Sequence, residues 1–462
     1  MAESPQSGKI DLAGRRVTLL GLGARTNVEL ARYLVRRGAI VTISDRKPAE
    51  QLQLEIGLLA DLPVRLSLGG HREEDLLGAD VVFVTPGVPR DLPVLVAARR
   101  AGVPLSSEIE LLFTECRSPI VGITGSSGKT TTTTLVGLML EADGQRTFVG
   151  GNIGVPLINR LDEIGADSKV VLELSSFQLE AMTVSPAIGA ILNVTPNHLD
   201  RHRTMEAYTQ AKLNVVRHQA PGDRAILGLD DPIAASLGPE CRGRVSHFSL
   251  RRPVEEGACL RGDVLVLRRD GVEQEVCRVG DVRLLGEHNL LNVLAAAAIA
   301  GAAGVRPEAV ASVATSFAGV EHRLEPVRTM GGVTFYNDSI ATAPERTCAA
   351  LRAFDRPIVL IAGGRSKHLP LEEMARLVVQ RCRAVVTISE MADEVEAALR
   401  VTPGADRLTI RRGADLETAA RLALELAQPG DVVLLSPAGT SFDAFRDFEE
   451  RGARFKEIVR GL

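Results

Sequence analysis

The sequence predicts an α/β protein of three domains, each built on a parallel β-sheet that is covered by helices. Three observations support this prediction. The 462 residues are too many for one ordinary hydrophobic core. Short apolar runs rich in β-branched residues alternate with helical patterns along the chain. Glycine-rich or polar residues follow many of these runs, as they do where parallel strands end at a ligand-binding edge.

The first domain, residues 1–112, is predicted to be Rossmann-like. Its first strand runs into a Gly-x-Gly turn, and its second strand ends at Asp45, as in sites for dinucleotides or nucleotide sugars. Thr26 stands where the third glycine of the dinucleotide fingerprint belongs, so a diphosphate ligand is favoured over NAD. The predicted elements are segments 17–23, 40–45 and 81–87 as strands, and 27–37 and 90–101 as helices.

The central domain, residues 113–319, begins with a pattern that predicts binding of a nucleoside triphosphate. An apolar strand leads into the loop Gly125-Ser-Ser-Gly128, and Lys129 and Thr130 then open a helix. The loop amides can cradle phosphate oxygens, the lysine adds a positive charge, and the hydroxyl can reach Mg²⁺. The loop is shorter than the standard P-loop, which has glycine where Ile123 stands.

Two other strands of this domain, 169–173 and 187–193, also end in polar residues, which we expect to converge with the phosphate loop. Glu173 is predicted to be a ligand or outer partner of magnesium. For His198, a ligand role and a role as an ordinary loop residue are equally favoured. For Lys212, the helical pattern alone indicates a solvated lysine. Short strands between 242 and 285 predict a small β insertion, which an Ala-rich helix follows.

The third domain, residues 320–462, is predicted to be a doubly wound, Rossmann-like parallel sheet. Arg323 fits a phosphate and Asp338 fits a ribose or an ammonium group, although either could be an ordinary surface charge. The predicted strands lie near 333–336, 357–362, 384–388, 408–411 and 431–435, and the helices near 344–353, 371–381, 391–399 and 415–427.

Composition restricts the class of partner and the compartment. A net charge of −4 argues against duplex nucleic acid, and 3% aromatic residues without tryptophan argue against a stacking platform for single strands. The six scattered cysteines predict free thiols in a reducing compartment. Since neither a secretory signal nor a membrane-spanning run is visible, we expect a cytoplasmic protein, acting as a monomer.

Together these motifs resemble the Mur ligase family of peptidoglycan synthesis, and the resemblance covers nearly the whole chain. Several separate motifs in family order are far more specific than any one of them. The resemblance rests on segments 122–131, 151–156, 172–180, 193–201, 286–292, 322–323, 337–339 and 435–443.

The resemblance implies an ATP-dependent ligase that joins glutamate to UDP-N-acetylmuramoyl-L-alanine through an acyl phosphate and releases ADP and phosphate. D-Glutamate is the expected amino acid. L-Glutamate or another amino acid is an alternative, because Ile340 stands where the glutamate-adding ligases have lysine. The remaining alternatives are a folylpolyglutamate-type synthetase, an NAD-dependent dehydrogenase or other NAD-binding protein, and a regulatory P-loop ATPase.

The resemblance also implies two Mg²⁺ ions and carbamylation of Lys212, which turns an ammonium into an anionic oxygen donor. The implied catalytic residues are Lys129, Asn152, His198 and Lys212, and the implied metal ligands are Thr130, Glu173, His198 and Lys212. ATP is assigned to Gly125, Ser126, Ser127, Gly128, Lys129, Thr130, Thr131, Asn289, Asn292, Arg323 and Asp338; the UDP substrate to Gly23, Asp45, Arg46 and Gly87; and the amino acid to Thr342, Lys367, Ser441 and Phe448.

Overall fold

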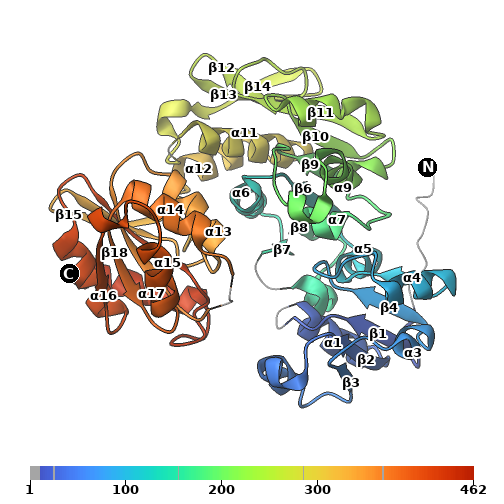
Figure 1. Cartoon of the computed structure of the whole chain (residues 1–462). Coiled ribbons are helices and arrows are strands. Elements are labelled where there is room, and N and C mark those ends of the chain that lie inside the picture. Colours follow the sequence, from blue (N-terminus) through green and yellow to red (C-terminus); the bar gives the residue numbers. More distant parts are fainter. Residues whose placement is uncertain (1–10, 24–25, 154–155, 285, 367–368) are drawn as a thin grey trace. The chain divides into compact units, whose positions relative to one another are not determined.

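The computed structural model describes residues 11–23, 26–153, 156–284, 286–366 and 369–462. The chain divides into two compact units, Met1–Phe317 and Ala318–Leu462 (Figure 1). The first unit contains two β-sheets and the second contains one. The domain boundaries at 112/113 and 319/320 stay predictions.

The first sheet is a five-stranded parallel sheet with the order β3-β2-β1-β4-β5, which confirms the Rossmann-like prediction. Helices α3 and α4 pack on one face, and α1 and α5 belong to the core on the other. The elements are β1 Arg16–Leu20, α1 Thr26–Arg36, β2 Ile40–Asp45, α2 Gln53–Leu58, β3 Arg65–Leu68, α3 Glu73–Leu77, β4 Val81–Val84, α4 Pro93–Arg100, β5 Leu105–Ser106 and α5 Glu108–Glu115.

The second sheet has nine strands in the order β14-β13-β12-β11-β10-β9-β6-β8-β7. The predicted β insertion extends this sheet: β11 and β12 continue it in parallel, and β13 and β14 close it as antiparallel strands. The strands are β6 Ile120–Thr124, β7 Thr147–Gly151, β8 Lys169–Glu173, β9 Ile188–Ile191, β10 Arg224–Gly228, β11 Arg244–Ser249, β12 Gly257–Arg261, β13 Val264–Arg269 and β14 Val272–Arg278.

Helices α6, α11 and α12 pack together on one face of this sheet, and α9 packs on the opposite face. The core on the α9 face continues into the first sheet through α5 and a 3₁₀ helix at Leu157–Glu163, so the two sheets of the first unit share one hydrophobic cluster. The helices are α6 Lys129–Ala142, α7 Ser176–Leu179, α8 Leu199–His202, α9 Met205–Arg217, α10 Pro232–Ser236, α11 Glu287–Ala302 and α12 Pro307–Ser316.

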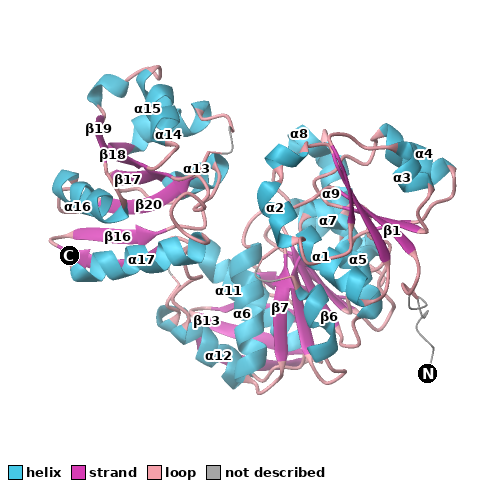
Figure 2. Cartoon of the chain, turned by 90° about the horizontal axis from the view of Figure 1, so that it is seen from below, coloured by secondary structure: helices cyan, strands magenta, loops and turns pink. Residues whose placement is uncertain are grey.

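The second unit has the strand order β15-β16-β20-β17-β18-β19, in which only β15 is antiparallel to its neighbour. Helices α13, α14 and α15 cover one face, and α16 and α17 cover the other (Figure 2). This arrangement confirms the doubly wound prediction. The elements are β15 Glu325–Met330, β16 Val333–Asn337, α13 Pro344–Arg352, β17 Ile358–Gly363, α14 Glu372–Arg381, β18 Cys382–Ile388, α15 Ala392–Arg400, β19 Thr409–Arg412, α16 Leu416–Leu426, β20 Val432–Ala438 and α17 Phe448–Gly461.

Two further features concern the chain as a whole. All six cysteines lie among the described residues and are free thiols. Within the described ranges, no helix is both long enough and apolar enough to cross a membrane.

Candidate functional site

The order of the central strands brings four strand ends together. Strands β9, β6, β8 and β7 are neighbours and all parallel, so their carboxyl ends lie at one edge of the sheet. The residues at this edge are Asn193 after β9, Gly125–Thr130 after β6, Glu173 at the end of β8, and Gly151-Asn152 at the end of β7.

The phosphate loop needs glycine at positions 125 and 128, because neighbouring atoms leave no room for a Cβ there. Gly128 has φ +80° directly before α6, and a Cβ there would collide with the Asn292 side-chain oxygen. A Cβ on Gly125 would lie 2.9 Å from the Leu192 Cβ. The first of these contacts places the start of α11 beside the loop. Asn292 also lies 3.4 Å from the Asn289 side-chain oxygen, so the two asparagines assigned to the nucleotide are adjacent.

Asn193 holds the beginning of the phosphate loop, a role that the predicted site did not include. Its Oδ1 accepts hydrogen bonds from the amides of Ser126 at 3.1 Å and Ser127 at 2.9 Å. The next amides, at Lys129–Thr131, open helix α6, and the first amides of a helix have no acceptor within it. The loop is therefore fixed at its start and presents helix amides at its end.

Glu173 connects two other predicted residues, Thr130 and Asn152. This side chain is buried, and its two carboxylate oxygens accept from Thr130 Oγ1 at 2.8 Å and from Asn152 Nδ2 at 2.7 Å. Gly151 makes the arrangement possible, because it has φ +90° and a Cβ there would press against the Glu173 backbone. A carboxylate beside a hydroxyl provides the oxygen ligands that magnesium prefers.

Lys212 is one of the most deeply buried side chains of the chain, so the solvated position that its helical pattern indicates is wrong. Its Nζ donates to the Gly125 carbonyl at 2.8 Å, and Lys129 Nζ donates to the same oxygen at 3.0 Å. The ring of Tyr208 lies 4.5 Å from the Lys212 amine. Burial and then the charge of Lys129 lower the pKa of Lys212 to about 6, against the opposite effect of Glu173.

His198 precedes the single-turn helix α8 and has φ +53°. Its side chain is exposed, and its ring contacts the edge of Phe177 with a centroid distance of 5.0 Å. The neighbouring His202 is buried, lies 3.0 Å from Ser176 Oγ, and stacks on the same Phe177 ring. Burial lowers the pKa of His202, so a structural role fits this second histidine.

The residues predicted as metal ligands include only two acidic or histidine side chains. Across the part of the chain that the structure describes, no group of three or more His, Cys, Asp or Glu residues is placed to hold a metal. The predicted set is made up of Thr130, Glu173, His198 and Lys212.

The residues predicted for the UDP substrate lie at or directly after the ends of β1, β2 and β4, which are neighbours in the first sheet. The Asp45 carboxylate accepts from the amides of Leu22 at 2.6 Å and Lys47 at 2.8 Å, and so ties the two loops together. The remaining predicted residues, Gly23, Arg46 and Gly87, are exposed.

A pocket of about 150 Å³ connects these loops with the central sheet. Asn27, Thr85 and Pro86 line it from the first sheet, and Asn152 and Phe177 line it from the second. The structure thus brings the loop after β4 and Asn152 to one cavity.

In the second unit, Asp338 follows β16 and is buried. Its oxygens accept from Ser436 Oγ at 2.8 Å and from the Leu324 amide at 3.2 Å. Burial raises the pKa of Asp338 to about 7, although both hydrogen bonds and the charge of Arg323 act in the opposite direction. Arg323 itself is exposed.

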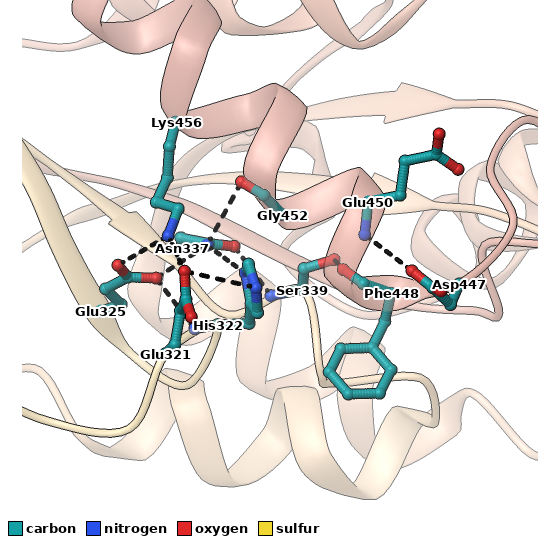
Figure 3. A network of polar contacts seen from close by, with 10 residues as sticks. All are labelled: Glu321, His322, Glu325, Asn337, Ser339, Asp447, Phe448, Glu450, Gly452 and Lys456. Carbon is teal, nitrogen blue, oxygen red and sulfur yellow. Dashed lines mark hydrogen bonds and ion pairs between the residues drawn. The ribbon is translucent and has the colours of Figure 1, made fainter. Parts of the chain in front are cut away.

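A polar network fixes the strand end that carries Asp338 (Figure 3). Asn337 Nδ2 lies 2.9 Å from His322 Nδ1 and 3.0 Å from a Glu325 carboxylate oxygen. Lys456 of α17 pairs with Glu325 at 3.1 Å and also with Glu321. Burial lowers the pKa of His322, which favours the neutral ring that can accept from Asn337.

Two of the residues predicted for the amino acid follow neighbouring strands of this unit. Ser441 is buried after β20, and Thr342 follows β16. Phe448 opens α17, and its carbonyl accepts from Ser339 Oγ at 2.8 Å (Figure 3). Lys367 lies outside the described residues.

Arg451 is a residue of this region that sequence reasoning missed. It is 1% exposed, and its guanidinium donates to the carbonyls of Ser339, Gly439 and Thr440. It therefore joins the loops after β16 and β20. Nothing in the local pattern distinguishes it from the other arginines of an amphipathic helix.

Comparison with known families identifies the class of protein. The description "Mur ligase MurD-like, N-terminal domain" matches residues 15–107, "Mur ligase middle domain" matches 123–300, and "Mur ligase, glutamate ligase domain" matches 322–439. The chain belongs to the Mur ligase family, and the ligase class expected from its motifs is confirmed.

Curated relatives narrow this class. The chain is 47% identical over 449 residues to the UDP-N-acetylmuramoylalanine–D-glutamate ligase of Symbiobacterium thermophilum, covering 97% of this chain and 98% of that protein. It is 42% identical over 459 residues to the ligase of the same name from Acetivibrio thermocellus, with 98% coverage of each. The UDP-N-acetylmuramate–alanine ligase of Thermotoga maritima shares the fold, with a TM-score of 0.55, 20% identity, and coverage of 97% and 99%.

We expect Gly151→Ala to destabilise the first unit more than Gly144→Ala. Both glycines have positive φ, but a Cβ meets the Glu173 backbone only at Gly151 and meets open space at Gly144. The conformational cost of about 1 kcal/mol is common to both variants, and the close contact adds about 1–3 kcal/mol. Differential scanning calorimetry should show the lower midpoint for Gly151→Ala. Equal midpoints would rule out the close approach.

We expect Asp338→Asn to stabilise the second unit increasingly as pH rises from 5 to 8. The folded pKa of Asp338 lies above its ordinary value, so the native carboxyl costs stability as pH rises from about 4 to 7. Between pH 5 and 8 the stability gain of this variant should grow by about 3 kcal/mol, measured by thermal unfolding.

Asp431→Asn is the matched control of opposite sign. Burial raises the pKa of Asp431, but hydrogen bonds from Arg383 and Gln428 lower it overall. This variant should lose stability at both pH 5 and pH 8. A stability gain of Asp338→Asn that does not change with pH would contradict the raised pKa of Asp338.

Proposed function

We propose that this chain is an ATP-dependent ligase of peptidoglycan synthesis that adds D-glutamate to UDP-N-acetylmuramoyl-L-alanine. The observation that carries the proposal is the hydrogen-bonded set of Thr130, Glu173 and Asn152 at the end of the phosphate loop. This set lies on a chain whose relatives of 47% and 42% identity carry the name of that ligase over nearly their full length. We infer that it acts in the cytoplasm as a monomer.

For ATP, we propose that the amides at the start of α6 and the Lys129 amine bind the terminal phosphates, while Asn289 and Asn292 lie towards the adenine. Thr130 and Glu173 fit Mg²⁺, because their oxygens are already adjacent. Bound magnesium would neutralise charge on the phosphates. His198 and a modified Lys212 would complete the ligands of a second ion.

The modification that we propose at Lys212 is a carbamate. The buried amine hydrogen-bonds to a neutral carbonyl and a neutral hydroxyl, and shares the carbonyl with a second lysine. An amine in this position is held uncharged, and only an uncharged amine attacks CO₂. The nitrogen bonds to the CO₂ carbon and releases one proton, which leaves an anionic group next to Lys129.

The proposed reaction has two steps. The alanyl carboxylate of the UDP substrate attacks the γ-phosphorus, and ADP leaves with the electron pair of the broken bond. The amine of glutamate then attacks the acyl phosphate, phosphate leaves, and the amine proton is lost as the amide forms. Lys129 and the loop amides offset the negative charge that gathers in the first step, and Asn152 orients the reacting groups.

The second unit would supply the incoming amine. We propose that Thr342, Lys367, Ser441 and Phe448 hold glutamate, and that Arg323 and Asp338 contact the nucleotide. Ile340 provides no cation where the glutamate-adding ligases have lysine, so the carboxylates of glutamate would depend on the other groups of this region.

The direct test is phosphate release from ATP by the whole chain, with each co-substrate added or omitted. We expect release only when UDP-N-acetylmuramoyl-L-alanine and an amino acid are both present, and at least about tenfold faster release with D-glutamate than with L-glutamate. Lys129→Ala should lower kcat about 10²- to 10³-fold, as the loss of a transition-state donor does. Phosphate release at the same rate with and without the two co-substrates would exclude the ligase function. Equal rates with D-glutamate and L-glutamate would exclude specificity for the D-enantiomer.

Lys212→Ala should also lose most activity, and a small carboxylate such as acetate should restore part of it. Acetate can supply the anionic oxygens that the carbamate would have carried, since truncation leaves a space at the buried position. The measurement is the ligation rate against acetate concentration. Lys129→Ala is the control. It should not be rescued by acetate, because this variant has lost a positive charge and acetate supplies a negative one. Full activity of Lys212→Ala without acetate would remove the carbamate from the mechanism.

A further inference from the structure

Arg201 connects the two sheets of the first unit. It lies in helix α8, and its guanidinium donates to the carbonyls of Gly87 at 3.0 Å, Val88 at 3.0 Å and Pro86 at 3.4 Å in the loop after β4. The guanidinium also lies 5.4 Å from the Phe177 ring centroid. Three acceptors in one loop use the fixed fork of an arginine, which a lysine cannot reproduce.

The segment that carries Arg201 is attached at its other end to the phosphate loop. Asn193 accepts from the amides of Ser126 and Ser127, and Thr195 exchanges hydrogen bonds with Ser126 Oγ at 2.9 and 3.0 Å. His198 lies between these attachments, in a left-handed conformation directly before α8. Segment 193–203 therefore contacts the phosphate loop at its beginning and the β4 loop at its end.

The contacts of Arg201 also orient the β4 loop. In a trans peptide, the carbonyl and the amide of one plane point in opposite directions. With the Pro86 carbonyl turned towards Arg201, the Gly87 amide faces the other way. Pro86 also lines the pocket that reaches Asn152. A ligand that binds the Gly87 amide therefore contacts one side of the Pro86–Gly87 peptide, while Arg201 contacts the other side.

We propose that Arg201 is a positioning residue that couples binding of the UDP substrate to the phosphate loop and His198. This inference rests on the proposed function, because it takes the β4 loop as the site of the nucleotide sugar. A substrate that fixes the β4 loop also fixes Arg201, and through α8 it favours one position of segment 193–203. Because coupling between two binding sites is reciprocal, a nucleotide bound at the phosphate loop favours the position of the β4 loop that binds the UDP substrate.

The test is the affinity for Mg·ADP, measured by titration calorimetry with and without saturating UDP-N-acetylmuramoyl-L-alanine. In the unaltered chain the two dissociation constants should differ by a factor of about 5 to 150, the range typical of coupled sites. Arg201→Met should bind Mg·ADP alone as tightly as the unaltered chain, but the ratio should fall to within about twofold of one. Its KM for the UDP substrate should rise. Arg201→Lys, which keeps the charge without the fork, should have an intermediate ratio.

Arg203→Met is the matched control, because Arg203 belongs to the same segment and also contacts the first sheet. Its side chain is 80% exposed and pairs with Asp91 at 3.2 Å, so the ratio should stay that of the unaltered chain. An unaltered ratio in Arg201→Met, or an equal loss in Arg203→Met, would overturn the proposal. If Arg201→Met fails to bind Mg·ADP, the ratio is measured in Arg201→Lys instead. A reduced ratio in that variant supports the proposal, and an unaltered ratio overturns it.

The coupling and the proposed function can fail separately. Coupled binding in a chain that does not ligate glutamate would refute the ligase function and leave the role of Arg201 in place. Ligation without any coupling in the unaltered chain would refute the role of Arg201 alone.

Discussion

The carbonyl oxygen of Gly125 accepts hydrogen bonds from two lysine amines, and this convergence constrains the chemistry of the central site. Two ammonium groups cannot share a buried acceptor without cost, since burial and mutual repulsion both disfavour the second charge. Lys129 is the more exposed of the two, and its amine donates to the carbonyls of Gly125 and Ser126. Lys212 is therefore the amine on which the uncharged form is favoured, although the Glu173 carboxylate acts in the opposite direction.

The same edge of the sheet also depends on residues outside the predicted site. Asn193 fixes the beginning of the phosphate loop, and Gly151 allows Asn152 to approach Glu173. The first sheet is held to this edge by a continuous apolar core and by Arg201. The apolar cores beneath these strand ends are closely packed. A small shift of one loop can therefore alter the hydrogen bonds of another loop without moving the sheets.

Most of the fold could be predicted because its strands are buried on both faces. Such strands appear as unbroken apolar runs, and β17 and β20 matched the predicted segments closely. Strand β15 was missed because it is an exposed edge strand with mixed polarity and a proline. The site was predictable where a motif names the residue, as for Lys129. It was not predictable for Asn193, Arg201 or Arg451, whose roles depend on partners far away in the sequence.

Arg451 bears on the absence of a lysine at position 340. Its guanidinium is buried, and the hydrogen bonds it makes within the described part of the second unit go to uncharged oxygens of Ser339, Gly439 and Thr440. Burial lowers its pKa to about 10, against the opposite effect of the Asp443 carboxylate, so the guanidinium stays cationic at neutral pH. A fixed cation beneath two strand-end loops gives them a positive potential, strengthened by the low dielectric around it. In the amino-acid site proposed near Ser441, this buried guanidinium is a positive charge that Ile340 does not provide.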